Sequence, residues 1–220
     1  MFKFSIAGEG VTDQITIENI LCGFFENEDL DGEINYSQPL FDESDNKQKG
    51  FGNWTLLLEY LEHSQFREDT LNCGYIVVQV DTDVSNEKGF DVSQYDEQNQ
   101  PLAPEDLIAN VIAKLIDTIE IGEQGFYQEN ADKIVFAISV HSIECWLYAH
   151  YNKKSLRNPK ITGCNKALSR LLQFDEKNYG HYKEISKPFQ KRKNIDAVAN
   201  KDASFRVFLQ ALEKVEFNLE

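Results

Sequence analysis

Three runs of apolar and β-branched residues, each followed by acidic residues, constrain the fold of this chain more than any other feature. The runs are Phe2 to Ala7, Tyr75 to Val80 and Ile134 to Val140. Near-continuous apolar runs of this length are typical of strands that are covered on both faces. Between them, apolar residues recur three and four positions apart, which predicts helices. The sequence therefore predicts an α/β fold, a sandwich with a largely parallel central sheet flanked by helices.

Acidic residues follow each of the three predicted strands. Glu9 follows the first strand, Asp81 and Asp83 follow the second, and Glu144 follows the third. Because the carboxyl ends of parallel strands meet at one edge of a sheet, we expect these side chains to converge. Carboxylates repel one another unless a cation lies between them, and hard cations such as Mg²⁺ take oxygen ligands. The sequence therefore predicts a Mg²⁺ or Mn²⁺ site of the kind that acts on phosphates.

These four acids are assigned as candidate metal ligands, and simpler explanations stay open for each of them. We interpret Glu9, Asp81 and Asp83 as catalytic residues as well as ligands, and Glu144 as a ligand only. Alternatively, Glu9 is an exposed loop acid, and Glu144 a first-turn acid favoured by the helix dipole. Asp81 and Asp83 would then be two aspartates that form a turn.

Asp13 and His141 lie close to these acids in the sequence and have simpler interpretations. Asp13 is placed to cap a helix or to interact with its dipole. His141 is interpreted as a structural residue at the end of a strand, with metal binding as the alternative.

This order of motifs resembles the TOPRIM domain of topoisomerases, primases and related nucleases. That family carries a Glu after its first strand and an Asp-x-Asp after a later strand. Small stand-alone TOPRIM-like proteins of prokaryotic genomes, including the RloB-like group, are more similar. They also carry a Glu-x-Trp-Leu segment, which Glu144, Trp146 and Leu147 reproduce, and a Gly-rich entry to the second helix, similar to Gly50 to Trp54. The resemblance covers roughly residues 1–151.

The resemblance implies a TOPRIM-like sandwich and a metal-dependent nuclease that cleaves phosphodiesters of DNA or RNA. In that family the residue that matches Glu9 is proposed as a general acid/base or a metal ligand. Similar proteins are often encoded beside ATPases in phage-defence or mobile-element loci, so the resemblance also implies a partner ATPase. The chain has no P-loop signature, and we do not expect it to hydrolyse ATP itself.

Charge is distributed unevenly along the chain, whose net charge is −15. Residues 1–150 hold 7 Lys and Arg against 29 Asp and Glu, whereas residues 151–206 hold 14 against 5. We therefore divide the chain into an α/β core, residues 1–151, and a basic, mainly helical C-terminal extension packed on it, residues 152–220. Basic residues in such a region grip the phosphate backbone of nucleic acids. The candidates are Lys183, Lys187, Lys191, Arg192 and Lys193.

Two other functions remain open on the sequence alone. The basic segment would also be explained as a solvated surface that offsets the acidic core, and the acidic core is not typical of a free-standing nucleic-acid binder. The chain would then be a non-catalytic interaction module whose acidic surface docks on a basic partner or mimics nucleic-acid charge. A third reading is a nucleotide-binding or nucleotidyl-transferring enzyme on the same metal site, because fold alone does not select among these activities.

Cysteine spacing and hydropathy indicate the cellular setting. The four cysteines are scattered without a Cys-x-x-Cys pair, so we expect reduced, structural thiols and no zinc site. No apolar run approaches the ~20 residues that a membrane helix needs. The N-terminus enters a strand pattern directly and has no signal-peptide layout, which predicts a cytoplasmic protein.

Overall fold

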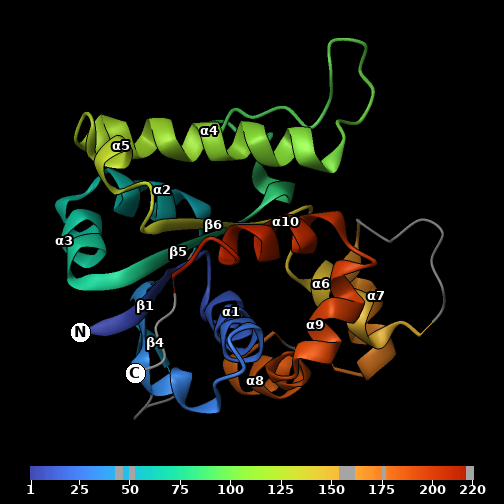
Figure 1. Cartoon of the computed structure of the whole chain (residues 1–220). Coiled ribbons are helices and arrows are strands. Elements are labelled where there is room, and N and C mark those ends of the chain that lie inside the picture. Colours follow the sequence, from blue (N-terminus) through green and yellow to red (C-terminus); the bar gives the residue numbers. More distant parts are fainter. Residues whose placement is uncertain (43–46, 50–52, 154–161, 175–176, 217–220) are drawn as a thin grey trace.

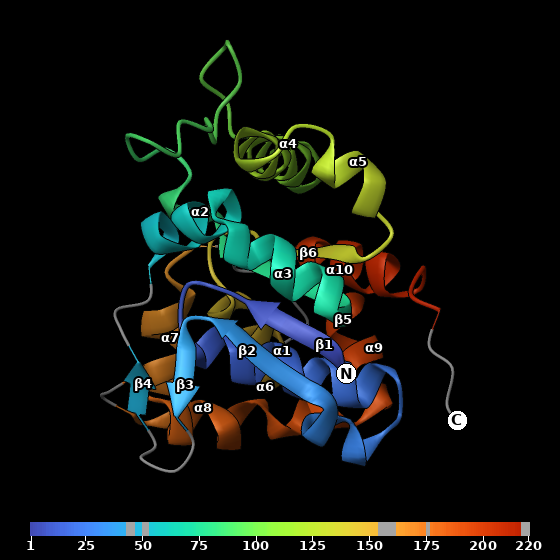
Figure 2. The same cartoon turned by 90° about the vertical axis from the view of Figure 1, so that its left-hand side faces the viewer.

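The computed structural model describes residues 1–42, 47–49, 53–153, 162–174 and 177–216. Its centre is a four-stranded sheet in which every neighbouring pair of strands is parallel (Figures 1 and 2). The strand order is β2-β1-β5-β6, with bounds β1 Phe2–Ala7, β2 Ile34–Gln38, β5 Cys73–Asp81 and β6 Ile134–Ser139. The predicted α/β fold with a largely parallel central sheet is confirmed, and the three predicted apolar runs are the strands β1, β5 and β6.

The register of the sheet brings the three acidic segments to one edge. Ala7, the last residue of β1, pairs with Val78 of β5. Asp81, the last residue of β5, pairs with Ser139, the last residue of β6. The acids that follow each strand therefore start from neighbouring positions at the carboxyl edge of the sheet.

Side chains alternate along the strands and build one hydrophobic core on each face of the sheet. Val77 and Ala137 lie in one core, whereas the next residues along the strands, Val78 and Phe136, lie in the other. This alternation follows from the two-residue period of a β-strand. It also explains why β5 and β6 are apolar throughout, since a sheet covered on both faces leaves no side for polar residues.

Helices cover both faces. On one face, which is the upper face in Figure 1, lie four helices: α2 Trp54–Glu62, α3 Ser64–Asn72, α4 Pro104–Gly122 and α5 Phe126–Asn130. The other face is covered by α1 Val11–Phe24, α6 Glu144–Tyr151, α7 Cys164–Leu172, α8 Tyr179–Ser186, α9 Arg192–Ala199 and α10 Ala203–Leu212. Short 3₁₀ helices join these elements: η1 Glu28–Glu33, η2 Thr82–Val84 and η3 Lys187–Gln190.

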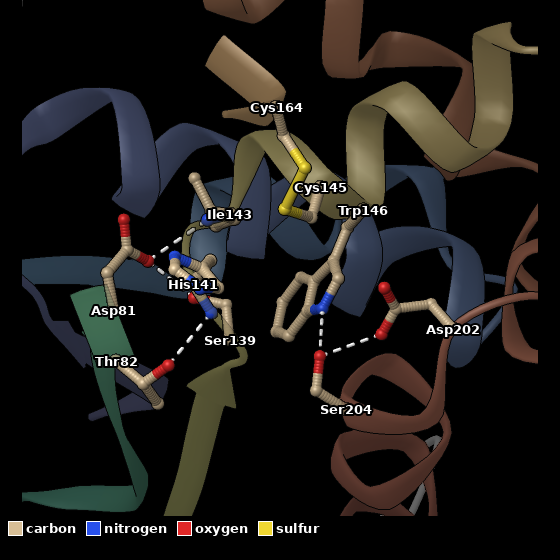
Figure 3. The surroundings of a disulfide bond; sticks show 10 residues. All are labelled: Asp81, Thr82, Ser139, His141, Ile143, Cys145, Trp146, Cys164, Asp202 and Ser204. Carbon is tan, nitrogen blue, oxygen red and sulfur yellow. Dashed lines mark hydrogen bonds between the residues drawn. A yellow bond between two sulfur atoms is a disulfide. The ribbon is translucent and has the colours of Figure 1, made fainter. Parts of the chain in front are cut away.

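The helices that follow residue 152 share a hydrophobic core with α1 and α6. Trp146 of α6 stacks on Phe208 of α10, with ring centroids 5.7 Å apart, and its Nε1 donates to Ser204 Oγ at 2.8 Å (Figure 3). Ser204 Oγ in turn donates to Asp202 Oδ1 at 2.7 Å. The indole therefore satisfies its one polar atom while it anchors α10 beside the sheet.

The sequence patterns do not predict several helices and strands of the structure. The polar, Gly-containing run from Phe41 to Gly52 predicts a loop, but two short antiparallel strands overlap it: β3 Leu40–Asp42 at its start and β4 Lys47–Lys49 within it. Its other residues, 43–46 and 50–52, lie outside the described residues. Helix α3 buries only Phe66, Arg67 and Thr70, too few apolar residues to give a helical pattern. Asn53 caps α2, because its side chain accepts from Leu56 N–H at 2.9 Å.

The expectation that all four cysteines are reduced is wrong for one pair. Cys145 of α6 and Cys164 of α7 form a disulfide (Figure 3), whereas Cys22 and Cys73 are free and buried. The two bonded cysteines are 19 residues apart. Such a pair gives no local motif, since its partners meet only when α7 packs on α6.

In the described part of the chain, no helix combines the length and apolar character needed to cross a membrane.

Helix α1 and η3 approach each other so closely that only glycine fits at one position. A Cβ added to Gly23 would lie 1.9 Å from the carbonyl oxygen of Phe189, which is a backbone atom. We therefore expect Gly23→Ala to lower the free energy of unfolding by about 1–3 kcal/mol, as overpacking of a core does. Urea unfolding followed by circular dichroism measures this change.

Gly32 provides the matched control, because a Cβ there would meet no atom within 4 Å. Gly32→Ala should change the free energy of unfolding by no more than about 0.5 kcal/mol. Equal effects of the two substitutions would contradict the close approach of η3 to α1.

Candidate functional site

The loop between β1 and α1 places Glu9 against the end of β5. Glu9 Oε1 accepts a hydrogen bond from the Asp81 backbone N–H at 2.8 Å. The neighbouring glycines let this loop lie close to its surroundings, since a Cβ on Gly8 would be 3.1 Å from Gln79 Oε1 and one on Gly10 would be 3.1 Å from Asp13 Oδ2. The first two acidic segments, 72 residues apart in the sequence, are thus joined directly.

Asp81 is held by donors from three places around the strand ends. Its Oδ1 accepts from Gln79 Nε2 at 2.8 Å, from the Ile143 backbone N–H at 3.0 Å, and from Ser139 Oγ (Figure 3). Gln79 and Ser139 are fully buried polar residues within β5 and β6. These hydrogen bonds fix the direction of the Asp81 carboxylate relative to both strands.

The turn after β6 is tied to η2, which carries Asp83. The His141 backbone N–H donates to Thr82 Oγ1 at 2.8 Å, and the Asp83 N–H donates to the His141 carbonyl at 3.0 Å. His141 has a φ of 64°, in the left-handed region that residues other than glycine seldom adopt. Its two backbone hydrogen bonds hold this conformation and keep the exposed Asp83 beside the end of β6.

Glu144 and Asp13 share one cation, the ammonium group of Lys177. Lys177 Nζ lies 2.9 Å from Glu144 Oε1 and 3.6 Å from Asp13 Oδ1. Tyr182 O–H donates to Glu144 Oε1 at 2.6 Å. Both acids are almost fully buried, whereas the Lys177 side chain is 39% exposed. Helices α1, α6 and α8 therefore meet around this ion pair.

We call Glu9, Asp13, Asp81, Asp83 and Glu144 the acid cluster. Burial raises the pKa of Glu9 to about 8; the hydrogen bond from Asp81 opposes this rise, and the charges of Asp13 and Asp83 add to it. Burial, and then the charges of Glu9 and Asp13, hold the pKa of Asp81 well above its usual range. Burial also raises the pKa values of Asp13 and Asp83. The acid cluster therefore carries more carboxylates than its surroundings stabilise in the ionised form.

Glu144 is the exception within the acid cluster. Burial opposes its ionisation, but Lys177 and the hydrogen bond from Tyr182 outweigh burial and lower its pKa. For Lys177, burial acts to lower the pKa, and the charges of Asp13 and Glu144 reverse this and raise it. Glu144 and Lys177 are thus an ionised pair at neutral pH, while the charge on the other acids remains poorly compensated.

The oxygen atoms of the acid cluster are of the type that binds a hard cation, but the carboxylates are not arranged around a common point. Asp13 Oδ1 and Gln79 Oε1 are buried and accept no hydrogen bond from the described residues. Such oxygens are the ligands that Mg²⁺ takes. Within the described residues, no group of three or more His, Cys, Asp or Glu side chains has a geometry that could hold a metal ion. The residue types therefore fit a cation, and side chains would have to rotate for several of them to bind it together.

The structure separates the predicted site residues into two groups. Glu9, Asp81, Asp83 and Glu144 lie together at the carboxyl edge of the sheet, with Asp13 and His141 beside them. The predicted nucleic-acid contacts lie elsewhere, on α8, η3 and α9. Lys183, Lys187 and Lys191 line a cavity that contains no member of the acid cluster.

Arg192 and Lys193 do not line that cavity. Arg192 has a structural role: its Nε pairs with Asp196 Oδ1 at 3.0 Å and its Nη1 donates to the Phe24 carbonyl at 3.1 Å. Its guanidinium also lies over the Phe24 ring, 4.7 Å from the centroid. Lys193 is exposed on α9.

Sequence reasoning missed Lys177, Gln79 and Ser139 as residues of the site. Gln79 and Ser139 interrupt apolar strand runs, and a polar residue in a buried strand is a usable signal of a nearby site. Lys177 has no such signal, because it lies in a polar segment between helices and reaches the acid cluster only through packing.

Comparisons with known proteins give no assignment. No protein-family model matches the chain, and no curated protein and no solved structure shows significant similarity to it. The geometry of the acid cluster is therefore the basis for any statement about function.

The raised pKa of Glu9 makes stability depend on pH. Between its ordinary value near 4.5 and about 8, Glu9 holds a proton in the folded state that the unfolded chain has lost. Stability must therefore fall as pH rises through this range. From pH 7 to 8.5, in the presence of EDTA, we expect the free energy of unfolding to fall by about 1 kcal/mol on account of Glu9.

The Glu9→Gln variant isolates this effect, because it keeps the shape of the side chain and cannot ionise. Urea unfolding at both pH values should give a smaller fall for Glu9→Gln than for the wild type. Identical falls in the two proteins would contradict the assignment to Glu9.

Removing Lys177 should leave two buried acids without their cation. We expect Lys177→Met to lower the free energy of unfolding at pH 7 by about 1–2 kcal/mol, less than the 3–5 kcal/mol typical of a fully buried pair, because the lysine is partly exposed to solvent. Lys166→Met, at an exposed position of α7, is the matched control and should cost less than about 0.5 kcal/mol. A cost for Lys177→Met no greater than that of the control would show that the ion pair contributes nothing.

Proposed function

We propose that this protein is a TOPRIM-like phosphodiesterase that depends on a divalent cation, Mg²⁺ or Mn²⁺, and cleaves nucleic acid. One observation carries the proposal: at the carboxyl edge of the sheet, Glu9, which follows β1, accepts a 2.8 Å hydrogen bond from the backbone N–H of Asp81, the last residue of the neighbouring strand β5. Ligand sites of open α/β sheets lie at this edge. The raised pKa values of Glu9, Asp13, Asp81 and Asp83 support it, since they indicate that a further positive charge would stabilise the acid cluster.

Glu9, Asp81 and Asp83 would hold the cation, with Glu144 as a further ligand once Lys177 releases it. A divalent cation in this position would offset the charge of the acid cluster and stabilise negative charge on the phosphoryl oxygens. The buried oxygens Asp13 Oδ1 and Gln79 Oε1, which lack hydrogen-bond donors among the described residues, would become ligands or accept from bound water.

The remaining chemistry is supplied by side chains of the chain itself. A cation beside Glu9 would lower the pKa that burial raises, so Glu9 would act as an ionised ligand while the cation is bound. Lys177, whose side chain is 39% exposed, would bind a substrate phosphate when it leaves Glu144. Tyr182 would then remain as the donor that orients Glu144.

The charge distribution supports help from a partner. The acidic first part of the chain repels nucleic acid, so a free-standing enzyme would bind its substrate weakly. A partner ATPase in a phage-defence or mobile-element system would supply additional contacts and bring the substrate to the acid cluster. This partner belongs to the proposal and follows from the TOPRIM-like resemblance.

The test begins with metal binding and continues with cleavage. Calorimetric titration with Mg²⁺ and Mn²⁺, with and without nucleic acid present, should give saturable binding that Asp81→Asn removes. DNA and RNA, single-stranded and duplex, should be cut by the wild type, and Glu9→Gln and Asp81→Asn should each reduce the rate by about 10²-fold or more. Circular dichroism spectra would verify that both variants remain folded.

Asp117→Asn is the matched control, because Asp117 is an exposed acid of α4. It should leave both metal binding and cleavage unchanged. A wild type that binds no divalent cation, even with nucleic acid present, would overturn the proposal.

An ordered acidic loop favours a second candidate function, docking on a basic partner. Part of the segment 85–103, between η2 and α4, projects from the body of the molecule (Figure 1), while Phe90 within it is buried in the core. The loop is fixed by hydrogen bonds from Val92 N–H to the Ser85 carbonyl at 2.8 Å and from Gln94 Nε2 to the Thr82 carbonyl at 2.7 Å. It exposes Glu87, Asp91 and Glu97. A docking module would keep partner binding in the Glu9→Gln and Asp81→Asn variants and lose it when these three loop acids are changed to amides.

A further inference from the structure

A second cavity lies on the α1 side of the sheet, away from the acid cluster. It has a volume of about 730 Å³, is partly open to solvent, and lies between α1 and η1 on one side and α8, η3 and the start of α9 on the other. Its volume lies within the ~300–1,000 Å³ range of small-molecule sites. None of its lining residues belongs to the acid cluster, so it is a separate place on the molecule.

One wall of the cavity is basic. Lys183 of α8, Lys187 of η3 and Lys191, which precedes α9, line this wall, and Glu184 of α8 lines it as well. Within the described residues, none of these lysines forms an ion pair with a carboxylate. Their charge is available to an anionic ligand.

The opposite wall is acidic. Glu28 and Asp31 of η1 line the same cavity and are exposed. Their position is fixed, because Leu30 between them is fully buried in the core and the Asn27 side chain caps η1 by accepting from Asp29 N–H at 3.0 Å. Glu18 of α1 lies on the same side, so the charged residues of this wall are all acids, whereas the other wall carries three lysines and one acid, Glu184.

Side-chain amides hold α1 against the end of α8 and η3. Asn19 of α1 donates through Nδ2 to Ser186 Oγ at 2.7 Å, and its Oδ1 accepts from Gln190 Nε2 at 2.7 Å. Both Asn19 and Gln190 line the cavity. Gly23, which admits the backbone of η3, permits this close approach. Packed secondary structure therefore positions the backbone of the cavity walls, and their charged side chains are exposed or partly exposed to solvent.

The opposed walls define the ligand. A simple anion would meet the lysines but be repelled by Glu28 and Asp31, and a polyamine would be repelled by the lysines. A ligand that suits both walls carries an anionic group at one end and N–H donors at the other. A nucleotide has both: a phosphate for the lysines, and an exocyclic amino group of the kind that Glu and Asp accept from cytosine.

We propose that this cavity binds a nucleotide unit whose base carries an exocyclic amino group, with the phosphate on Lys187 and Lys191 and the amino group toward Glu28 and Asp31. The unit is either a free nucleotide or one residue of a single strand. Binding here does not require the acid cluster to be catalytic, so this proposal stands or falls separately from the proposed function.

Calorimetric titration of the full chain with CMP and UMP is the direct test, because these nucleotides share the phosphate and differ at the amino group. We expect CMP to bind about tenfold more tightly than UMP, which is within the discrimination that one good base contact provides. Lys187→Ala/Lys191→Ala should abolish CMP binding. Glu28→Gln/Asp31→Asn should keep binding and lose the preference for CMP.

Controls separate this site from general charge effects. Lys193→Ala removes an exposed lysine of α9 that does not line the cavity, and it should leave CMP binding unchanged. Inorganic phosphate should bind much more weakly than CMP. Asp81→Asn should also leave CMP binding unchanged, so that loss of cleavage and loss of this site are told apart.

A parallel arm with single-stranded oligocytidine and oligouridine in EDTA identifies the source of the nucleotide. Tighter binding of CMP than of the oligonucleotide supports a free nucleotide, and the reverse supports a strand; both must be lost in Lys187→Ala/Lys191→Ala. Three results would overturn the proposal: no binding of either form, equal affinity for the cytidine and uridine forms, or CMP binding that survives loss of both lysines.

Discussion

The interaction on which the site depends is the contact between Lys177 and the buried acids Asp13 and Glu144. Burying one carboxylate without a partner is costly, and this molecule gathers five acids at one edge of its sheet. Lys177 and Tyr182 stabilise the ionised form of Glu144, which leaves Glu9, Asp13, Asp81 and Asp83 with raised pKa values. The protein thus accepts unfavourable electrostatics at this edge, as active sites commonly do.

The sequence predicts those residues of the site whose positions are set by a strand close to them in the sequence. Glu9, Asp81 and Glu144 each follow a strand within a few residues, and a parallel sheet brings those positions to one edge whatever else the chain does. The β-branched runs identify the strands, because burial on both faces removes polar residues from them. Position and residue type together were therefore enough to predict the acidic edge, while the metal that it would bind stays a proposal.

The rest depends on contacts between segments far apart in the chain, which no local pattern records. Lys177 pairs with Glu144, 33 residues earlier, only because α8 packs beside α1 and α6. The Cys145–Cys164 disulfide likewise joins two helices, and the 19-residue separation of its cysteines gives no local motif. The contacts of Arg192 with Phe24 and Asp196 arise in the same way from tertiary packing. Composition identified this region as basic, but it could not show which lysine and arginine side chains form contacts within the protein.

Helix α8 contacts the acid cluster and also lines the cavity, so its position affects both. Tyr182 donates to Glu144, and the next residue, Lys183, lines the cavity. The helix continues into η3, where Phe189 is buried and Gln190 is hydrogen-bonded to Asn19 of α1. A ligand in the cavity, as proposed, would therefore also favour the position of α8 from which Tyr182 reaches Glu144. By thermodynamic linkage, a change at Glu144 that displaces α8 would in turn weaken the proposed binding.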